Sequence, residues 1–187
     1  MAPTLFVPLA LNFLLIGALP LVFFRRDGRL NVRWWLTASP LFVAGGAVTA
    51  GLFGLVDVWA LPPDLADGAA IIAAELSIAS VALVCYTLGT HRRRIALWHQ
   101  DNDAPGEIVT DGPYRHIRHP FYTAFVTALT AAALALPSPI TAGCLVWGVV
   151  ALSLTARREE ARLLDSVFGS EYRLYMRRTG RLLPLIG

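Results

Sequence analysis

Four long stretches without charge constrain this chain more than any other feature. Residues 1–24, 34–56 and 120–156 contain no charged side chain, and residues 68–90 contain only Glu75. About 20 apolar helical residues are enough to cross the hydrocarbon core of a bilayer. Hydrophobic residues make up 56% of the chain and charged residues 16%, unlike an ordinary soluble domain. The pattern predicts an all-α, polytopic membrane helix bundle in which the first three stretches form one span each.

The fourth uncharged stretch is too long for a single crossing. As one helix, residues 120–156 would extend about 55 Å. Pro137-Ser138-Pro139 interrupts the stretch near its middle, and proline removes a backbone donor and favours a turn. We therefore expect a tight helical hairpin with arms at about 120–136 and 140–156, each short for a full span. Five transmembrane helices result.

The tail after the hairpin is predicted to form two cytoplasmic helices. Residues 157–168 continue the helical pattern with an apolar stripe. Gly169 suits the end of this helix and Ser170 the N-cap of the next one. The second helix is expected at about 171–178, where basic and aromatic residues could lie at the membrane interface.

The basic residues predict the orientation of the chain in the membrane. All 16 are arginines, and they fall between spans one and two, between spans three and four, and after span five. The loop at 57–67 has three aspartates and no basic residue. The positive-inside rule then places the N-terminus outside and the C-terminus in the cytoplasm. Topology and anionic membrane lipids account for the basic loops without nucleic acid, and the absence of lysine favours a bacterial plasma membrane.

Polar chemistry concentrates in two segments on the cytoplasmic side. The first is "GPYRHIRHPFY" (112–122), and the second is residues 157–184, in which Glu159 and Glu160 follow span five. A hairpin with a tight outer turn returns the chain to the same surface, so the two segments should meet there. Glu159 or Glu160 could bind an amine or a hydroxyl of a cofactor.

The first segment offers complementary groups. Gly112-Pro113 permits a tight turn, and the backbone donors and acceptors exposed by such a turn could read a base such as adenine. His119, with Tyr114 or Tyr122, could hold a cofactor carboxylate. This surface suits a charged, water-borne cofactor beside a lipid-soluble substrate.

A plainer interpretation fits the same residues. Arginines at the end of a span are usually topology signals, tyrosines there are usually interfacial anchors, and a glutamate pair is often solvated and paired with arginine. Glu75 is a stronger indication of function, because a carboxylate within a membrane span is energetically costly and is more often functional than not. Cys85 and Cys144 lie in apolar runs, and no metal-binding spacing such as His-Glu-x-x-His occurs.

The two polar segments together carry a family likeness. "EIVTDGPYRHIRHPFY" (107–122) and "REEARLLDSVFGSEYRLYMRRTGRLLP" (158–184) resemble the integral-membrane methyltransferases, which include isoprenylcysteine carboxyl methyltransferase and the phospholipid N-methyltransferases. The likeness covers about residues 85–184 and leaves 1–84 as scaffold or substrate-facing spans of a single domain, 1–187. Where the family often has a glycine, this chain has Ala124, which is also small enough for close helix packing.

The resemblance implies a cofactor and a set of residues. S-adenosylmethionine would be the methyl donor, and a lipophilic acceptor would enter from the bilayer. Arg181 would orient a carboxylate-bearing acceptor, and Glu159 could help to deprotonate an amine. The sequence does not decide whether the methyl acceptor is a prenylcysteine, a phospholipid amine, or an isoprenoid or fatty carboxylate. It does not predict the oligomeric state either. The residues carried over to the cofactor are Val109, Gly112, Pro113, Tyr114, Arg118, His119, Tyr122, Glu159 and Glu160.

Two other functions compete with methyl transfer. Membrane sterol reductases look similar around Arg-His-Pro-x-Tyr, so an NADPH-dependent reductase is one alternative. A non-catalytic membrane partner protein is the other, because charge asymmetry and interfacial aromatic residues would fit it. That alternative does not explain why two polar clusters should converge on one side.

Overall fold

The computed structural model describes residues 24, 27–91 and 107–184. These residues form five α-helices and one 3-10 turn, and no strand occurs among them, which agrees with the predicted all-α class. The span predicted at residues 1–24 lies almost wholly outside the described residues. The elements are α2 (Val32–Leu52), α3 (Pro63–Thr90), η1 (Gly112–Arg115), α4 (Pro120–Ala135), α5 (Pro139–Leu164) and α6 (Gly169–Met176).

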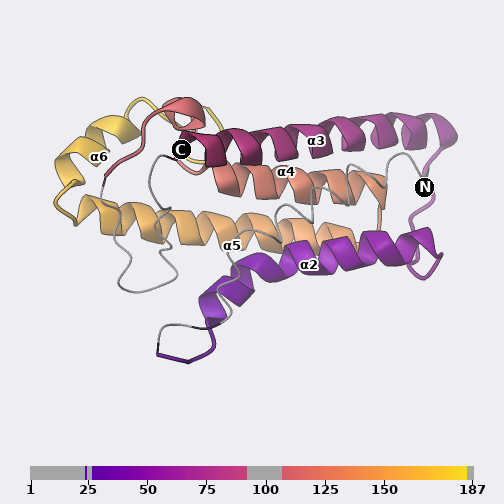
Figure 1. The fold of residues 1–187 in the computed structure, drawn as a ribbon. Helices are drawn as coiled ribbons and strands as arrows, with labels where there is room; N and C mark the ends of the chain where they lie inside the picture. The colour runs from indigo at the N-terminus through magenta and orange to yellow at the C-terminus, as the bar shows by residue number, and fades with distance from the viewer. Residues whose placement is uncertain (1–23, 25–26, 92–106, 185–187) are drawn as a thin grey trace.

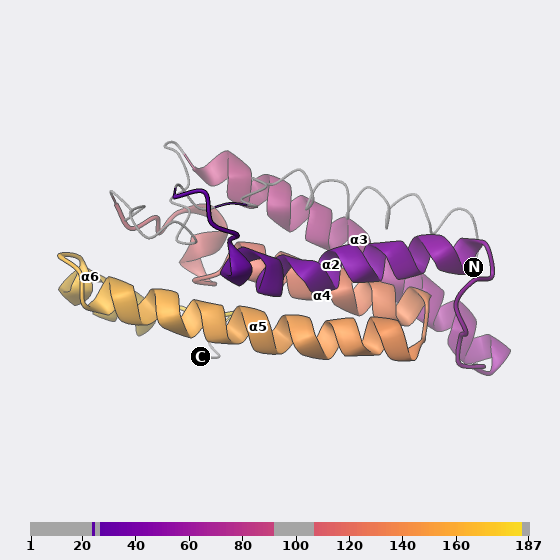
Figure 2. The same ribbon diagram turned by 90° about the horizontal axis from the view of Figure 1, so that it is seen from below.

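Three of these helices are long and apolar enough to cross a membrane: α2, α3 and α5. The fourth apolar helix, α4, has 16 residues and is therefore about 24 Å long, shorter than a hydrocarbon core of about 30 Å. The helices lie roughly along one another in an elongated bundle (Figures 1 and 2). The described part of the chain is thus an apolar helix bundle with one short arm.

The predicted hairpin between α4 and α5 is confirmed. Ser138 caps α5 by accepting from the backbone N–H of Thr141, and the Thr141 hydroxyl contacts the Ser138 N–H in return. This reciprocal capping satisfies donors that would otherwise be orphaned at the start of a helix. After the turn, α5 runs without a break to Leu164. Glu159 and Glu160 therefore lie within the last two turns of a continuous helix.

The boundaries predicted for the tail helices are wrong by several residues. The helix expected to reach residue 168 ends at Leu164, and the next one begins at Gly169 instead of 171. Gly169 does not end α5. It is the first residue of α6 and lies in close contact with the end of α5. A Cβ at Gly169 would collide with the backbone carbonyl of Leu164. The glycine is needed for this close approach of the two backbones.

Small residues form the contact between α3 and α4, the most extensive pair among the described helices. The buried positions of α3 include Ala73, Ser77 and Ser80. The Ser80 hydroxyl donates to the Ala124 carbonyl across the interface at 2.8 Å, and Ala124 itself is completely buried. Small side chains let membrane helices approach closely, as expected for the alanine at this position.

A different contact joins α2 to α5. The Trp147 indole N–H donates to the Leu36 carbonyl at 3.0 Å. One residue further on, a Cβ at Gly148 would collide with the Leu129 side chain and touch Pro40. The glycine therefore allows α2, α4 and α5 to pack together, and α2 begins close to the end of α5.

The helix ends next to the polar segments gather at one end of the bundle. These ends lie toward the left of Figure 1 and also toward the left of Figure 2. They are the start of α2, the end of α3, η1, the start of α4, the end of α5 and α6. The hairpin turn lies at the opposite end, where the Trp59 N–H donates to the Pro137 carbonyl at 2.8 Å. Polar segments far apart in sequence are thus brought to one end.

Candidate active site

The tail after α6 is held against the start of α4 by main-chain hydrogen bonds. The Gly180 N–H donates to the His116 carbonyl at 3.0 Å, and the Arg118 N–H donates to the Gly180 carbonyl at 2.8 Å. The His119 N–H donates to the Arg181 carbonyl at 3.1 Å. Because backbone pairing fixes two chain segments in register, it also fixes where the Arg118, His119 and Arg181 side chains lie.

Glu160 is the centre of a buried ion-pair cluster. Its Oε1 accepts from Arg118 Nε at 2.7 Å, and its Oε2 accepts from Arg181 Nε at 2.9 Å and Nη2 at 2.8 Å. The side chains of Arg118 and Glu160 are only 1% and 4% exposed, and that of Arg181 is 23% exposed. Arg118 Nη1 also donates to the Thr179 carbonyl. We call Arg118, Glu160 and Arg181 the Glu160 clamp. The clamp ties α5, the start of α4 and the tail together by charge-assisted hydrogen bonds.

Glu159, the preceding residue, belongs to a different group. The Tyr122 hydroxyl donates to Glu159 Oε1 at 2.7 Å, and His119 Nδ1 lies 3.5 Å from Glu159 Oε2. The His119 and Tyr122 rings stack almost parallel, with centroids 5.2 Å apart. His119 Nε2 lies 3.4 Å from Glu160 Oε1, so the imidazole sits between the two carboxylates.

Two buried nitrogens at this junction lack a hydrogen bond to any described residue: Arg118 Nη2 and His119 Nε2. His119 Nε2 is near Glu160 but is not aligned for a hydrogen bond. Buried polar atoms without partners are uncommon and call for an explanation such as a ligand or water. The site therefore has unused hydrogen-bonding capacity beside a carboxylate and a pair of stacked rings.

The predicted turn at Gly112-Pro113 is present as η1. Gly112 has φ of +56°, a left-handed conformation that favours glycine. A Cβ there would also collide with the Thr90 hydroxyl at the end of α3. Pro113 is buried, and Val109, in the segment that leads to the turn, is half-buried. Gly112 is thus required both by its backbone angle and by its contact with α3.

Tyr114 connects this turn to the rest of the site. Its hydroxyl lies 2.8 Å from His91 Nε2, and its carbonyl accepts from the Tyr175 hydroxyl at 2.6 Å. Burial raises the pKa of Tyr114, and the nearby Tyr175 and Glu159 raise it further, so the phenol is neutral at physiological pH. Burial lowers the pKa of His91, with Glu107 acting in the opposite direction.

The two polar segments meet, as predicted. Six of the predicted residues are linked to one another by hydrogen bonds, ion pairs or ring stacking, and the remaining four lie in or next to η1. Which of them bind a ligand stays a prediction. Glu75 is exposed on α3, and Arg115 is exposed on η1. The six in contact are Arg118, His119, Tyr122, Glu159, Glu160 and Arg181.

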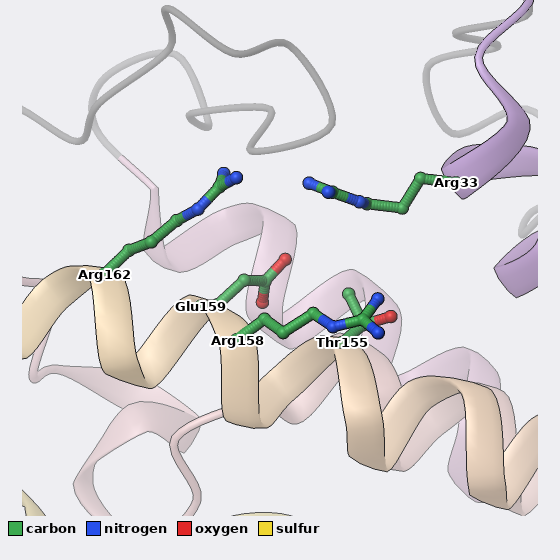
Figure 3. Close-up of a pocket in the computed structure, with 5 residues that line it drawn as sticks. All are labelled: Arg33, Thr155, Arg158, Glu159 and Arg162. Atoms are coloured by element: carbon green, nitrogen blue, oxygen red, sulfur yellow. The ribbon is translucent and has the colours of Figure 1, made fainter.

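A pocket beside Glu159 was not predicted from the sequence. It is lined by Arg33, Thr155, Arg158, Glu159 and Arg162, and Figure 3 shows the arginines extending around the Glu159 carboxylate. Arg33 comes from the first turn of α2, within the region expected to act only as scaffold or to face substrate. The sequence did place Arg33 on the same side of the membrane as the tail, and this was the available signal. Only the packing of α2 on α5, however, brings Arg33 to Glu159.

Ionisable side chains that pair with one another within an apolar helix bundle are typical of a functional site. The model of the isoprenylcysteine carboxyl methyltransferase (ICMT) family matches residues 69–165, just over half of the chain, and the chain belongs to this family. The resemblance to membrane methyltransferases is confirmed, and membership implies methyl transfer to a lipophilic acceptor. No curated protein and no solved structure matches the chain.

Proposed function

We propose that this protein transfers a methyl group from S-adenosylmethionine to a lipophilic or amphiphilic acceptor at the cytoplasmic face of the membrane. The observation that carries the proposal is the position of His119, stacked on Tyr122 between two carboxylates at the polar end of an apolar bundle. Family membership supports the methyl-transfer chemistry. The arginine distribution supports an outside N-terminus and a cytoplasmic C-terminus, and the absence of lysine favours a bacterial plasma membrane.

The residues of the site fit the groups that such a cofactor presents. It carries a carboxylate, an amine and a purine, and therefore needs donors, acceptors and a flat surface. The free nitrogens of Arg118 and His119 would hold the carboxylate, Glu159 would take the amine, and the backbone around Gly112 and Tyr114 would face the base. When bound, the cofactor supplies a methyl group that is already activated for transfer.

Positioning and exclusion of water are then the main tasks of this chain. Holding two reactants in the right geometry can lower a barrier by about 7–11 kcal/mol. The Glu160 clamp fixes the start of α4 against α5, so the His119–Tyr122 stack has one orientation. A buried site at the end of apolar helices also excludes water from the reacting groups.

The acceptor would meet two residues with different tasks. Arg181 engages Glu160 through Nε and Nη2, so the rest of its guanidinium is left to orient a substrate carboxylate. A carboxylate acceptor needs no general base. An amine acceptor must lose a proton, and Glu159 would assist in that step. We expect the acceptor to enter from the bilayer and the cofactor from water.

Methyl transfer by the purified protein tests this proposal. The protein in lipid nanodiscs would be incubated with methyl-labelled S-adenosylmethionine and separate isoprenoid carboxylates, prenylcysteines and phospholipid amines, and products would be detected by mass spectrometry. We expect labelled product from one class, abolished by His119→Ala and retained by Arg177→Gln, which changes an exposed tail residue. No product from any class, together with oxidation of NADPH, would favour a reductase instead.

A further inference from the structure

The pocket beside Glu159 has a charge imbalance that the candidate active site does not explain. Three of its five lining residues are arginines, and one is a glutamate. In Figure 3 the guanidinium groups of Arg33 and Arg162 point toward each other above the Glu159 carboxylate, and Arg158 extends along α5 past Thr155. The lining therefore carries a net charge of about +2, because arginine is always protonated in proteins.

The three arginines keep their hydrogen-bonding groups available. Among the described residues, none of them forms an ion pair within 4 Å, and each of the five ion pairs described in the structure involves other basic groups. Glu159 offsets only part of this positive charge, because its single negative charge also interacts with His119, and its Oε1 accepts a hydrogen bond from Tyr122. A planar guanidinium offers donors in a fork that matches phosphate geometry.

The surface next to the pocket is apolar. On α5, Trp147, Val150 and Leu154 are exposed, and so is Leu36 on the adjoining α2. Positions 147, 150, 154, 158 and 162 recur every three or four residues and therefore share one face of the helix. This face changes from apolar to cationic along its length, at the end of the bundle where the arginines gather. It matches an amphiphile with an anionic head and a hydrocarbon tail.

We propose that Arg33, Arg158 and Arg162 bind the phosphate headgroup of an anionic membrane lipid, whose acyl chain lies along the seam between α2 and α5. The proposal rests on the three converging arginines and the adjoining apolar face, not on the volume of the pocket, and does not require methyl transfer. Because Glu159 lines the pocket and also contacts His119, a bound phosphate lies next to the candidate active site.

Lipid competition on the full-length protein tests the proposal. Native mass spectrometry of the detergent-purified protein would compare binding of phosphatidylglycerol with that of phosphatidylcholine, which has no net charge. The test variant is Arg158→Gln/Arg162→Gln, and the matched control is Arg157→Gln, an exposed arginine of α5 that does not line the pocket. Arg158→Lys/Arg162→Lys keeps the charge but loses the forked geometry.

We expect the wild-type protein and Arg157→Gln to prefer phosphatidylglycerol by about tenfold or more, corresponding to one charge-assisted hydrogen bond. The double glutamine variant should lose this preference while binding phosphatidylcholine unchanged, and the lysine variant should retain part of it. A double glutamine variant that prefers phosphatidylglycerol as strongly as the wild-type protein does would overturn the proposal. Displacement of the lipid by glycerol phosphate at equal concentration would show a site for free phosphate and would also overturn it.

Discussion

Two groups of arginines lie at the same end of the bundle and differ in almost every physical respect. Arg118 and Arg181 share the Glu160 carboxylate, and Arg118 is almost completely buried. Arg158 and Arg162 are exposed and have no ion-pair partner among the described residues. The positive-inside rule counts both groups alike, although one stabilises the fold and the other remains available to a ligand.

The difference shows what a charge pattern can and cannot identify. In the Glu160 clamp, the desolvation cost of burying three charged groups is offset by short hydrogen bonds in good geometry. Around the pocket, Arg158 and Arg162 remain exposed to water, and a hydrated cation contributes little to stability. The same residue type is therefore structural in one group and free for recognition in the other, and burial decides between the two.

Removing the charge of Glu160 should have the largest effect on the comparison. Glu160→Gln leaves the buried Arg118 guanidinium without its counter-charge, and breaking a buried pair in this way costs about 3–5 kcal/mol. Thermal unfolding of the purified protein in detergent would measure the loss. Glu171→Gln, at an exposed position of α6, is the control and should unfold like wild type; equal stability of both variants would refute the clamp.

Removing the hydroxyl that joins Tyr122 to Glu159 should mainly affect ligand binding. Tyr122→Phe keeps the ring that stacks on His119 and loses one hydrogen bond to a carboxylate, worth about 1.5–3 kcal/mol. We expect S-adenosylhomocysteine to bind about tenfold or more weakly. Tyr86→Phe, which changes an exposed tyrosine of α3, should bind it normally, and an equal loss in both variants would remove Tyr122 from the site.

Arg181→Lys separates charge from geometry within the clamp. The hydrogen bonds to Glu160 raise the pKa of Arg181, so its charge is retained in alkaline solution. Lysine keeps a positive charge but cannot reproduce the Nε and Nη2 contacts, and we expect a loss of about 1 kcal/mol in unfolding free energy. Unfolding at pH 7 and pH 9 would check this, and a variant as stable as wild type would show that charge alone is needed.

Arg158→Gln should have the smallest effect on stability. Exposed substitutions usually change the free energy of unfolding by less than about 0.5 kcal/mol. The unfolding midpoint should therefore match wild type. A loss comparable to that of Glu160→Gln would mean that the pocket arginines also hold the fold, and the contrast between the two groups would disappear.

The sequence predicted the features that depend on composition and local chemistry. The uncharged run and Pro137-Ser138-Pro139 indicated the hairpin, and the hairpin indicated that Glu159 would return to His119. The end of α5 was not predictable in the same way, because it depends on the contact of Gly169 with the Leu164 carbonyl. Local propensity does not contain such a contact between two backbones.

The different environments of Glu159 and Glu160 could not be predicted from the sequence either. Adjacent residues of a helix point about 100° apart, so one faces Tyr122 and the other faces Arg118 and Arg181. Which one does so depends on the rotation of α5 against α4. The arrival of Arg33 at Glu159 depends in turn on the α2–α5 contact through Trp147, which no motif announces.

Isothermal titration of the detergent-purified protein with S-adenosylhomocysteine tests the central claim most directly. The account predicts saturable binding at one site, at least about tenfold weaker in His119→Ala and unchanged in Arg157→Gln. Absence of binding by protein that melts cooperatively, or tighter binding of NADPH than of S-adenosylhomocysteine, would contradict the proposed methyltransferase site.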